Sequence, residues 1–163
     1  MNLQPRIEKI KEIKLVGTRR IISFANNQTA LLWQTLMPRR REITKAINAN
    51  LYSVELYNDP HFFRNFDPTR EFEKWAAVPV SDFNAVPDGM HTLTIPAGEY
   101  AVFLYRGMPS EAKDTYQYIY GGWIPGSPYE LDDRPHFALM GEKYKGEDPE
   151  SEEEIWIPIA SRQ

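Results

Sequence analysis

The sequence contains an internal repeat: residues 5–80 and residues 89–160 follow the same order of strand, helix and turn signals. The segments Val78-Pro79-Val80 and Ile157-Pro158-Ile159 are near copies of each other, about 80 positions apart. A repeat of this length indicates two supersecondary units in tandem, and neither unit alone offers enough strands to bury a large core. We therefore expect the two units to pack together as one domain over residues 1–163.

The first unit reads as strand, helix, strand, strand. Residues 7–24 have the pattern of a long strand, and strands are again predicted at 51–57 and 72–80. A helix is predicted over 29–47, because its apolar residues recur at helical spacing on one face. Pro38 lies within this helix and should kink or break it.

The second unit repeats this order. A long strand is predicted over 91–105, and a helix follows over 112–123. Further strands are predicted at 135–145 and 154–159. The segment 81–89, rich in turn-forming residues, is expected to join the two units.

The expected fold class is therefore α+β, a tandem duplication of a β-α-β-β unit. Pairing the units would give antiparallel sheets with two long helices on one face. The strands of the two halves would then diverge at the pseudo-two-fold axis and leave a cleft, and clefts of this kind are common ligand sites.

Composition excludes several classes of protein. The chain has no cysteine, which excludes a disulfide scaffold, thiolate metal sites and a cysteine nucleophile. No apolar run approaches the roughly 20 residues that a membrane-spanning helix needs, and the first residues lack the apolar core of a signal peptide. We expect a cytoplasmic protein without a membrane partner.

Charge argues against direct nucleic-acid binding. The net charge is −4 and the isoelectric point is near 5.4, the opposite of a basic binding surface. Basic residues do gather in residues 1–50, but no recognition-helix or RNP-type pattern accompanies them. The dense acidic run at 147–153 is typical of a solvated loop.

Catalytic and metal-binding motifs are absent from the sequence. The three histidines, His61, His91 and His136, have no metal-ligand spacing, and no G-x-S-x-G elbow occurs. We expect no metal and no cofactor. Aromatic residues make up 13% of the chain, which suggests an open aromatic pocket, although packing in the core is an alternative.

The last strand carries the most informative pattern. Alternation places Glu154, Trp156 and Pro158 on one face and the isoleucines at 155, 157 and 159 on the other. A carboxylate beside an indole suits a cleft that takes a flat or cationic organic molecule. The alternative is that Glu154 points to water at a sheet edge. The repeat offset of 79 places Trp75 opposite Glu154 across the pseudo-axis, unless Trp75 belongs to the core.

Three stretches resemble a known family. Residues 123–137 read WIPGSPYELDDRPHF, residues 154–159 read EIWIPI, and residues 95–101 read IPAGEYA. Together they resemble the GyrI-like small-molecule-binding domain, the effector-binding module of bacterial AraC-type and multidrug-sensing regulators. The resemblance covers nearly the whole chain. It implies a tandem β-α-β-β duplication, in agreement with the repeat.

The resemblance implies a site for bulky aromatic or cationic organic compounds between the halves, used for sensing or sequestration. Glu154 matches the acid of the family's C-terminal motif and would supply the charge. The expected walls of the site are Trp75, Trp123, Tyr129, Phe137 and Trp156. Such domains usually follow a helix-turn-helix, and too few residues precede the first strand here, so the chain resembles a stand-alone member.

The chain departs from the family at Ala138, where the family often has a glutamate that projects into the pocket. Two other functions therefore stay open. One is a hydrolase of electrophilic xenobiotics such as cyclopropane-bearing toxins, with Glu154 as general base and Tyr129 as acid. The other is a protein-interaction module, such as a gyrase inhibitor or the partner of a regulator. The aromatic residues would also suit a homodimer patch.

Overall fold

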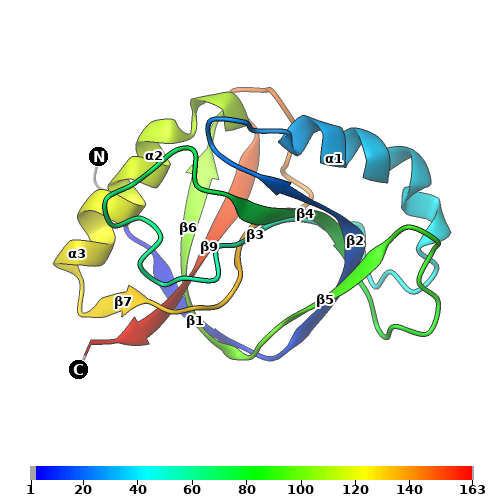
Figure 1. Cartoon of the computed structure of the whole chain (residues 1–163), viewed down its shortest axis with the longest axis horizontal. Helices are drawn as coiled ribbons and strands as arrows, with labels where there is room; N and C mark the ends of the chain where they lie inside the picture. The colour runs from blue at the N-terminus through cyan, green and yellow to red at the C-terminus, as the bar shows by residue number, and fades with distance from the viewer. Residues whose placement is uncertain (1–2, 163) are drawn as a thin grey trace.

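The computed structural model describes residues 3–162 and is built on an antiparallel sheet with the strand order β1-β6-β9-β8-β3-β4-β2-β5, while β7 pairs with β9 (Figure 1). The strands are β1 (Arg6–Ile10), β2 (Ile13–Ile22), β3 (Leu51–Leu56), β4 (Phe72–Pro79), β5 (His91–Ile95), β6 (Gly98–Arg106), β7 (Tyr129–Leu131), β8 (His136–Met140) and β9 (Glu152–Ser161). The helical segments are α1 (Thr29–Leu36), η1 (Met37–Glu42), η2 (Pro109–Glu111), α2 (Lys113–Tyr118), η3 (Ile119–Trp123) and α3 (Ile124–Gly126).

The two long strand regions expected from the sequence form one continuous ribbon. β1 pairs with β6 up to Ile10 opposite Gly98, and β2 pairs with β5 from Ile13 opposite Ile95, so one register runs through both pairings. The ladder is interrupted between them, where Pro96 has no N–H to donate. Each half therefore pairs a strand with the other half, and the two units are interlocked rather than merely side by side.

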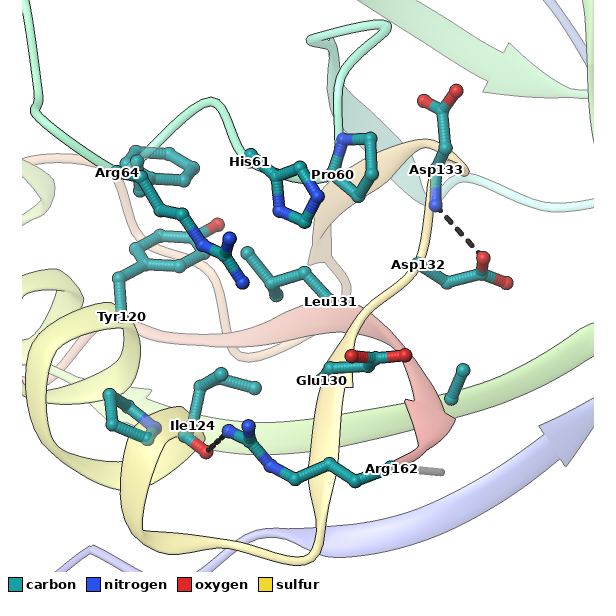
Figure 2. Close-up of a pocket in the computed structure, with 13 residues that line it drawn as sticks. Pro60, His61, Arg64, Tyr120, Ile124, Glu130, Leu131, Asp132, Asp133 and Arg162 are labelled. Atoms are coloured by element: carbon teal, nitrogen blue, oxygen red, sulfur yellow. Dashed lines mark hydrogen bonds between the residues drawn. The ribbon is translucent and has the colours of Figure 1, made fainter.

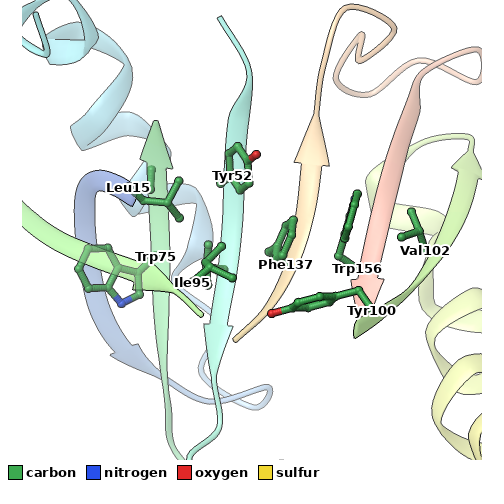
Figure 3. Close-up of a cluster of buried hydrophobic side chains, with 10 residues drawn as sticks. Leu15, Tyr52, Trp75, Ile95, Tyr100, Val102, Phe137 and Trp156 are labelled. Carbon is green, nitrogen blue, oxygen red and sulfur yellow. The ribbon is translucent and has the colours of Figure 1, made fainter. Parts of the chain in front are cut away.

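The register across the middle of the sheet defines an interior face. Val54 on β3 lies opposite both Phe137 on β8 and Trp75 on β4, and Phe137 lies opposite Trp156 on β9. These side chains join one buried cluster with Tyr100 of the ribbon. Figure 3 shows the rings of this cluster between the strands of the two halves. The interior of the curved sheet is therefore a packed aromatic core.

The neighbouring residues on the same strands form the opposite face, which we call the helix face. Ala76, Ser53, Ala138 and Ile155 follow one another across β4, β3, β8 and β9 on this face. It is covered at its two ends, because α1 packs on β2 and β4, whereas the second helical run packs on β6 and β9. Both runs lie outside the curved sheet in Figure 1. The central strands β3 and β8 therefore lie between the two helical runs.

The first helical run is shorter than the sequence predicts. It changes from α to 3-10 geometry at Met37 and ends at Glu42, rather than continuing to residue 47. Pro38 follows the change directly and removes one backbone donor. Ile47, which was expected on the buried face of the helix, is 60% exposed. The break at Pro38 was correctly predicted. The helical spacing of the apolar residues between Glu42 and Ile47 does not correspond to a helix.

Gly17 on β2 is required by close packing of two backbones. A Cβ at this position would overlap the carbonyl oxygen of Ala76 on β4. The absence of a side chain lets these two strands approach at the point where β2 also meets β5. Gly17 thereby fixes the corner at which the ribbon joins the rest of the sheet.

Candidate functional site

Three of the six residues predicted to line a ligand site lie in the interior core. Trp75, Phe137 and Trp156 are 1%, 2% and 8% exposed. The rings of Phe137 and Trp156 are stacked with centroids 5.2 Å apart. All three face the interior of the sheet, as Figure 3 shows, and they line neither of the two cavities described below. The seam between the halves, expected to be open at this face, is filled by the chain's own side chains.

Two further predicted residues lie on the opposite side of the sheet. Trp123 and Tyr129 stack on each other at 6.1 Å and pack against the cluster beneath the second helical run. The structure therefore does not bring the six predicted residues into one site. It also separates Tyr129 from Glu154, so these two side chains do not form a catalytic pair in this structure.

Glu154 lies on the same face of β9 as Trp156, as the alternation predicted, and sits at the rim of the interior core. Its carboxylate accepts a hydrogen bond from Arg6 at 2.7 Å and a second from the indole Nε1 of Trp156 at 3.2 Å. The side chain is 28% exposed and lines a cavity of about 430 Å³ together with Leu104, Leu139 and the neighbouring Glu153. The Glu154 carboxylate is thus partly exposed to solvent and held by two hydrogen bonds.

The first half contains the equivalent arrangement. Trp75 donates its indole N–H to Glu73 at 2.7 Å, and Arg19 lies 3.8 Å from the same carboxylate. The prediction that Trp75 faces Glu154 is therefore wrong. Trp75 and Trp156 are equivalent in register, on either side of the central β3–β8 pair, and each indole bonds to the glutamate two residues earlier on its own strand.

A second acidic cluster lies on the helix face, on the central strands between the helical runs. Glu55 on β3 lies opposite Lys74 on β4 and opposite His136 on β8. The Nζ atom of Lys74 is 3.0 Å from Oε2 of Glu55, and the two side chains are 12% and 13% exposed. We call this group, with its neighbours Tyr116, Tyr120 and Glu153, the inter-helix cluster.

Burial perturbs the acids of the inter-helix cluster. Loss of hydration raises the pKa of Glu55, and the nearby ammonium of Lys74 opposes that rise. Burial also raises the pKa of Glu153 to about 7; Lys74 opposes this rise and the negative charge of Glu55 adds to it. Two carboxyl groups with perturbed pKa values beside a specific charged partner are typical of functional sites.

The imidazole and the two phenols of the cluster are neutral at pH 7. Burial, followed by the charge of Arg134, lowers the pKa of His136 to about 3. The Nδ1 atom of this imidazole is 2.8 Å from the hydroxyl of Tyr120. Burial, and then the charge of Glu55, raises the pKa of Tyr116 and Tyr120 well above the usual range. The cluster therefore combines phenol rings with carboxyl groups in poorly hydrated surroundings.

Ala138, the departure from the family pattern, lies on this helix face. Its cross-strand neighbours are Ser53 on β3 and Ile155 on β9. Glu55 and Glu153 each stand two residues along those strands, so both are diagonal neighbours of Ala138, at a typical separation of about 7 Å. The acid missing at Ala138 is thus flanked by two acids on the same face.

A phenylalanine-containing loop covers the outer side of the cluster. Phe63, in the connection between β3 and β4, stacks on Tyr120 with ring centroids 3.9 Å apart. Outside this pair lies a cavity of about 580 Å³. Figure 2 shows Arg64 and Tyr120 on one side of this cavity and Glu130 across from them. Tyr120 therefore forms a wall of the cavity, while its hydroxyl reaches His136 behind it.

Sequence reasoning missed Glu55, Lys74 and Glu153. Alternation in the last strand did place Glu153 with the isoleucines, because residues two apart share a face. It did not show which side chains of the other strands and of the second helical run surround Glu153 on that face. The pairing of β3 with β8, which brings Glu55 near Ala138, joins residues more than 80 positions apart and has no local signal.

The part of the chain that the structure describes contains neither a metal-binding cluster nor a membrane-spanning helix. Within residues 3–162, no group of three or more His, Asp or Glu side chains could hold a metal ion. Within the same residues, no helix is long and apolar enough to cross a membrane.

Known proteins resemble this chain in sequence or in fold. The transcriptional regulator BrlR of Pseudomonas aeruginosa is 26% identical over 162 residues, which cover 97% of this chain and 56% of the regulator. The chain thus spans about half the length of that relative. The structure of SAV2435 bound to tetraphenylphosphonium has a TM-score of 0.69 at 16% identity and covers 97% of this chain and 94% of its own. The C-terminal domain of EcmrR has a TM-score of 0.67 at 20% identity, with 99% and 100% covered.

The sequence model of the GyrI-like small molecule binding domain matches residues 3–160. That match includes the ribbon, both helical runs, strands β1 to β8 and all but the last residue of β9. The WIPGSPYE and EIWIPI stretches both lie within the matched residues. This chain belongs to the GyrI-like family of small-molecule-binding domains.

Proposed function

We propose that this chain binds a bulky aromatic cation at the inter-helix cluster, for sensing or sequestration. The observation that carries the proposal is the pair of poorly hydrated acids, Glu55 and Glu153, on either side of Ala138. A relative of the same fold is bound to tetraphenylphosphonium, which is a cation of this class. The phenol rings of Tyr116 and Tyr120 would provide the aromatic surface.

The physical chemistry of the cluster suits such a ligand. A delocalised organic cation is weakly hydrated, so it enters a dry site at a smaller desolvation cost than a metal ion or an ammonium group. Its charge would hold both carboxylates in the ionised form. Rings packed around it add apolar burial and cation–π attraction. Access would require the ring of Phe63 to move away from Tyr120, next to the cavity of about 580 Å³.

A matched pair of substitutions tests this site, because Glu153 and Glu154 are adjacent on β9 but face opposite sides of the sheet. Affinity for tetraphenylphosphonium is measured by calorimetry for the wild type, Glu153→Gln and Glu154→Gln. We expect Glu153→Gln to weaken binding by about tenfold or more, which corresponds to about 1.4 kcal/mol. We expect Glu154→Gln to stay within about twofold of the wild type. Wild-type protein that shows no saturable binding would contradict the proposal.

A second candidate place for the same ligand is the cavity of about 430 Å³ beside Glu154. The observation that favours it is that Glu154 lines this cavity with the apolar side chains of Leu104 and Leu139. Binding there would require the cation to displace Arg6 from Glu154 or to share the carboxylate with it. Glu153 also lines this cavity, so binding there would be weakened by both Glu154→Gln and Glu153→Gln, whereas binding at the inter-helix cluster would be weakened by Glu153→Gln alone.

A further inference from the structure

Lys74 places a positive charge inside the inter-helix cluster. It arises from β4 on the helix face, and its ammonium lies 3.0 Å from Glu55 with little exposure to solvent. The same ammonium favours the ionised form of Glu153. Lys74 therefore interacts with both acids that the proposed ligand would need.

The charge balance of the cluster follows from this placement. When both acids are ionised, two carboxylates and one ammonium give the cluster a net negative charge that about one bound cation would neutralise. A ligand cation close to Glu55 would also lie close to Lys74, and like charges at a few ångströms repel strongly in poorly hydrated surroundings. The lysine stem is flexible, so the ammonium can withdraw from a cation, but it must then leave its partner Glu55.

Resting on the function proposed above, we propose that Lys74 is a specificity-determining residue, an internal counter-ion that weakens the preference of the site for cations over neutral aromatic compounds of the same shape. A chain with a neutral side chain at this position would discriminate more strongly in favour of cations. Lys74 would then tune which aromatic compounds are bound, while the rings and small residues around it decide their size.

The test compares two ligands that differ mainly in charge. Methyltriphenylphosphonium is a cation, and triphenylphosphine oxide is a neutral compound of similar size. Calorimetry gives the ratio of their affinities for the wild type, Lys74→Met and Lys74→Arg. We expect the cation-to-neutral ratio to rise about tenfold in Lys74→Met, since the repelling charge is lost. We expect Lys74→Arg, which keeps the charge, to retain the wild-type ratio within about threefold.

Two further variants keep the test decisive. Lys74→Met leaves Glu55 without its partner and is open to misfolding, so Lys74→Gln is measured as well, because its amide can donate a hydrogen bond to Glu55 without a charge. It should raise the ratio in the same direction. Lys11→Met, at an exposed lysine in the connection between β1 and β2, serves as the control and should leave the ratio unchanged.

The outcomes separate this inference from the proposed function. If the wild type binds neither ligand, the proposed function fails and Lys74 has no preference to tune. If the wild type binds but the ratio is unchanged or falls in both Lys74→Met and Lys74→Gln, the role of Lys74 is overturned while the binding function stands. A rise in the ratio with the neutral affinity kept within about threefold supports the inference.

Discussion

Glu153 and Glu154 are neighbours on β9 and both line the cavity of about 430 Å³, yet alternation along the strand places their side chains on opposite faces of the sheet. Glu154 is held by Arg6 and by the indole of Trp156 at the rim of the interior core. Glu153 stands on the helix face, where burial raises its pKa to about 7. A shift of one residue in the pairing of β9 would exchange the two acids, so the register of this strand decides which acid belongs to which site.

The first prediction concerns how stability depends on pH. Folding raises the pKa of Glu153 from about 4.5 to about 7, so the folded state binds more protons than the unfolded state in that interval. The contribution of this group to stability therefore falls as the pH rises from 4.5 through 7. We expect Glu153→Gln to be more stable than the wild type at pH 8, by roughly 1–3 kcal/mol.

Urea unfolding of the wild type, Glu153→Gln and Glu154→Gln at pH 5, 6.5 and 8 measures this difference. The advantage of Glu153→Gln over the wild type should grow with pH. For Glu154→Gln the difference in stability from the wild type should not grow with pH, because Glu153 keeps its raised pKa in that variant. Curves for the wild type and Glu153→Gln that stay parallel at all three values would contradict the assignment.

The second prediction concerns His136. Its pKa in the folded state is about 3, compared with about 6.5 for an unfolded histidine. Below pH 6.5 the unfolded chain takes up a proton that the folded chain does not, so the contribution of His136 to stability falls as the pH drops. NMR of the folded protein should show no titration of the His136 ring between pH 8 and 5, whereas a ring that shifts with a midpoint near 6.5 would show that it is hydrated.

The third prediction concerns the packing of β2 against β4. Gly17→Ala should cost about 2 kcal/mol or more, because its Cβ would overlap the backbone of Ala76. Gly126→Ala is the control, since a Cβ there would meet no atom within 4 Å. Thermal and urea unfolding of the two variants should differ by this amount, and equal stability would show that the strands can separate without loss.

The fourth prediction concerns the interior core. Trp75→Ala should destabilise the protein by roughly 3–5 kcal/mol, because it removes a fully buried ring from a packed cluster. Leu104→Ala, at a side chain that is 51% exposed, should cost well under about 1 kcal/mol. A small loss in Trp75→Ala, measured by urea unfolding, would mean that the interior is open to ligand or solvent rather than packed.

Much of the fold was predictable because its signals are local. Strand alternation correctly separated Glu154 and Trp156 from the isoleucines of β9, and Pro38 marked the change in the first helical run. The repeat correctly indicated a duplicated α+β unit. The repeat paired Trp75 with Glu154, whereas in the sheet Trp75 corresponds to Trp156. The offset between the two halves varies by about two residues along the chain, and an error of two residues moves a side chain one position along its face of the strand.

The inter-helix cluster was not predictable from the sequence for a different reason. Glu55, Lys74 and Glu153 come from three strands, and their proximity depends on the pairing of β3 with β8 and β8 with β9. Nothing near these residues in the chain shows that the central strands lie between the two helical runs. The absence of an acid at Ala138 was visible, but the two acids beside it became meaningful only once the helix face was known.

The place of β9 has a consequence for how the protein is made. This last strand lies between β6 and β8, and β6 in turn pairs with β1. Until Glu152–Ser161 leaves the ribosome, the nascent chain has two open strand edges and cannot close its sheet. Folding of this domain to the native state must therefore await the synthesis of β9, and a chain stalled before it would be a substrate for chaperones rather than a partly active domain.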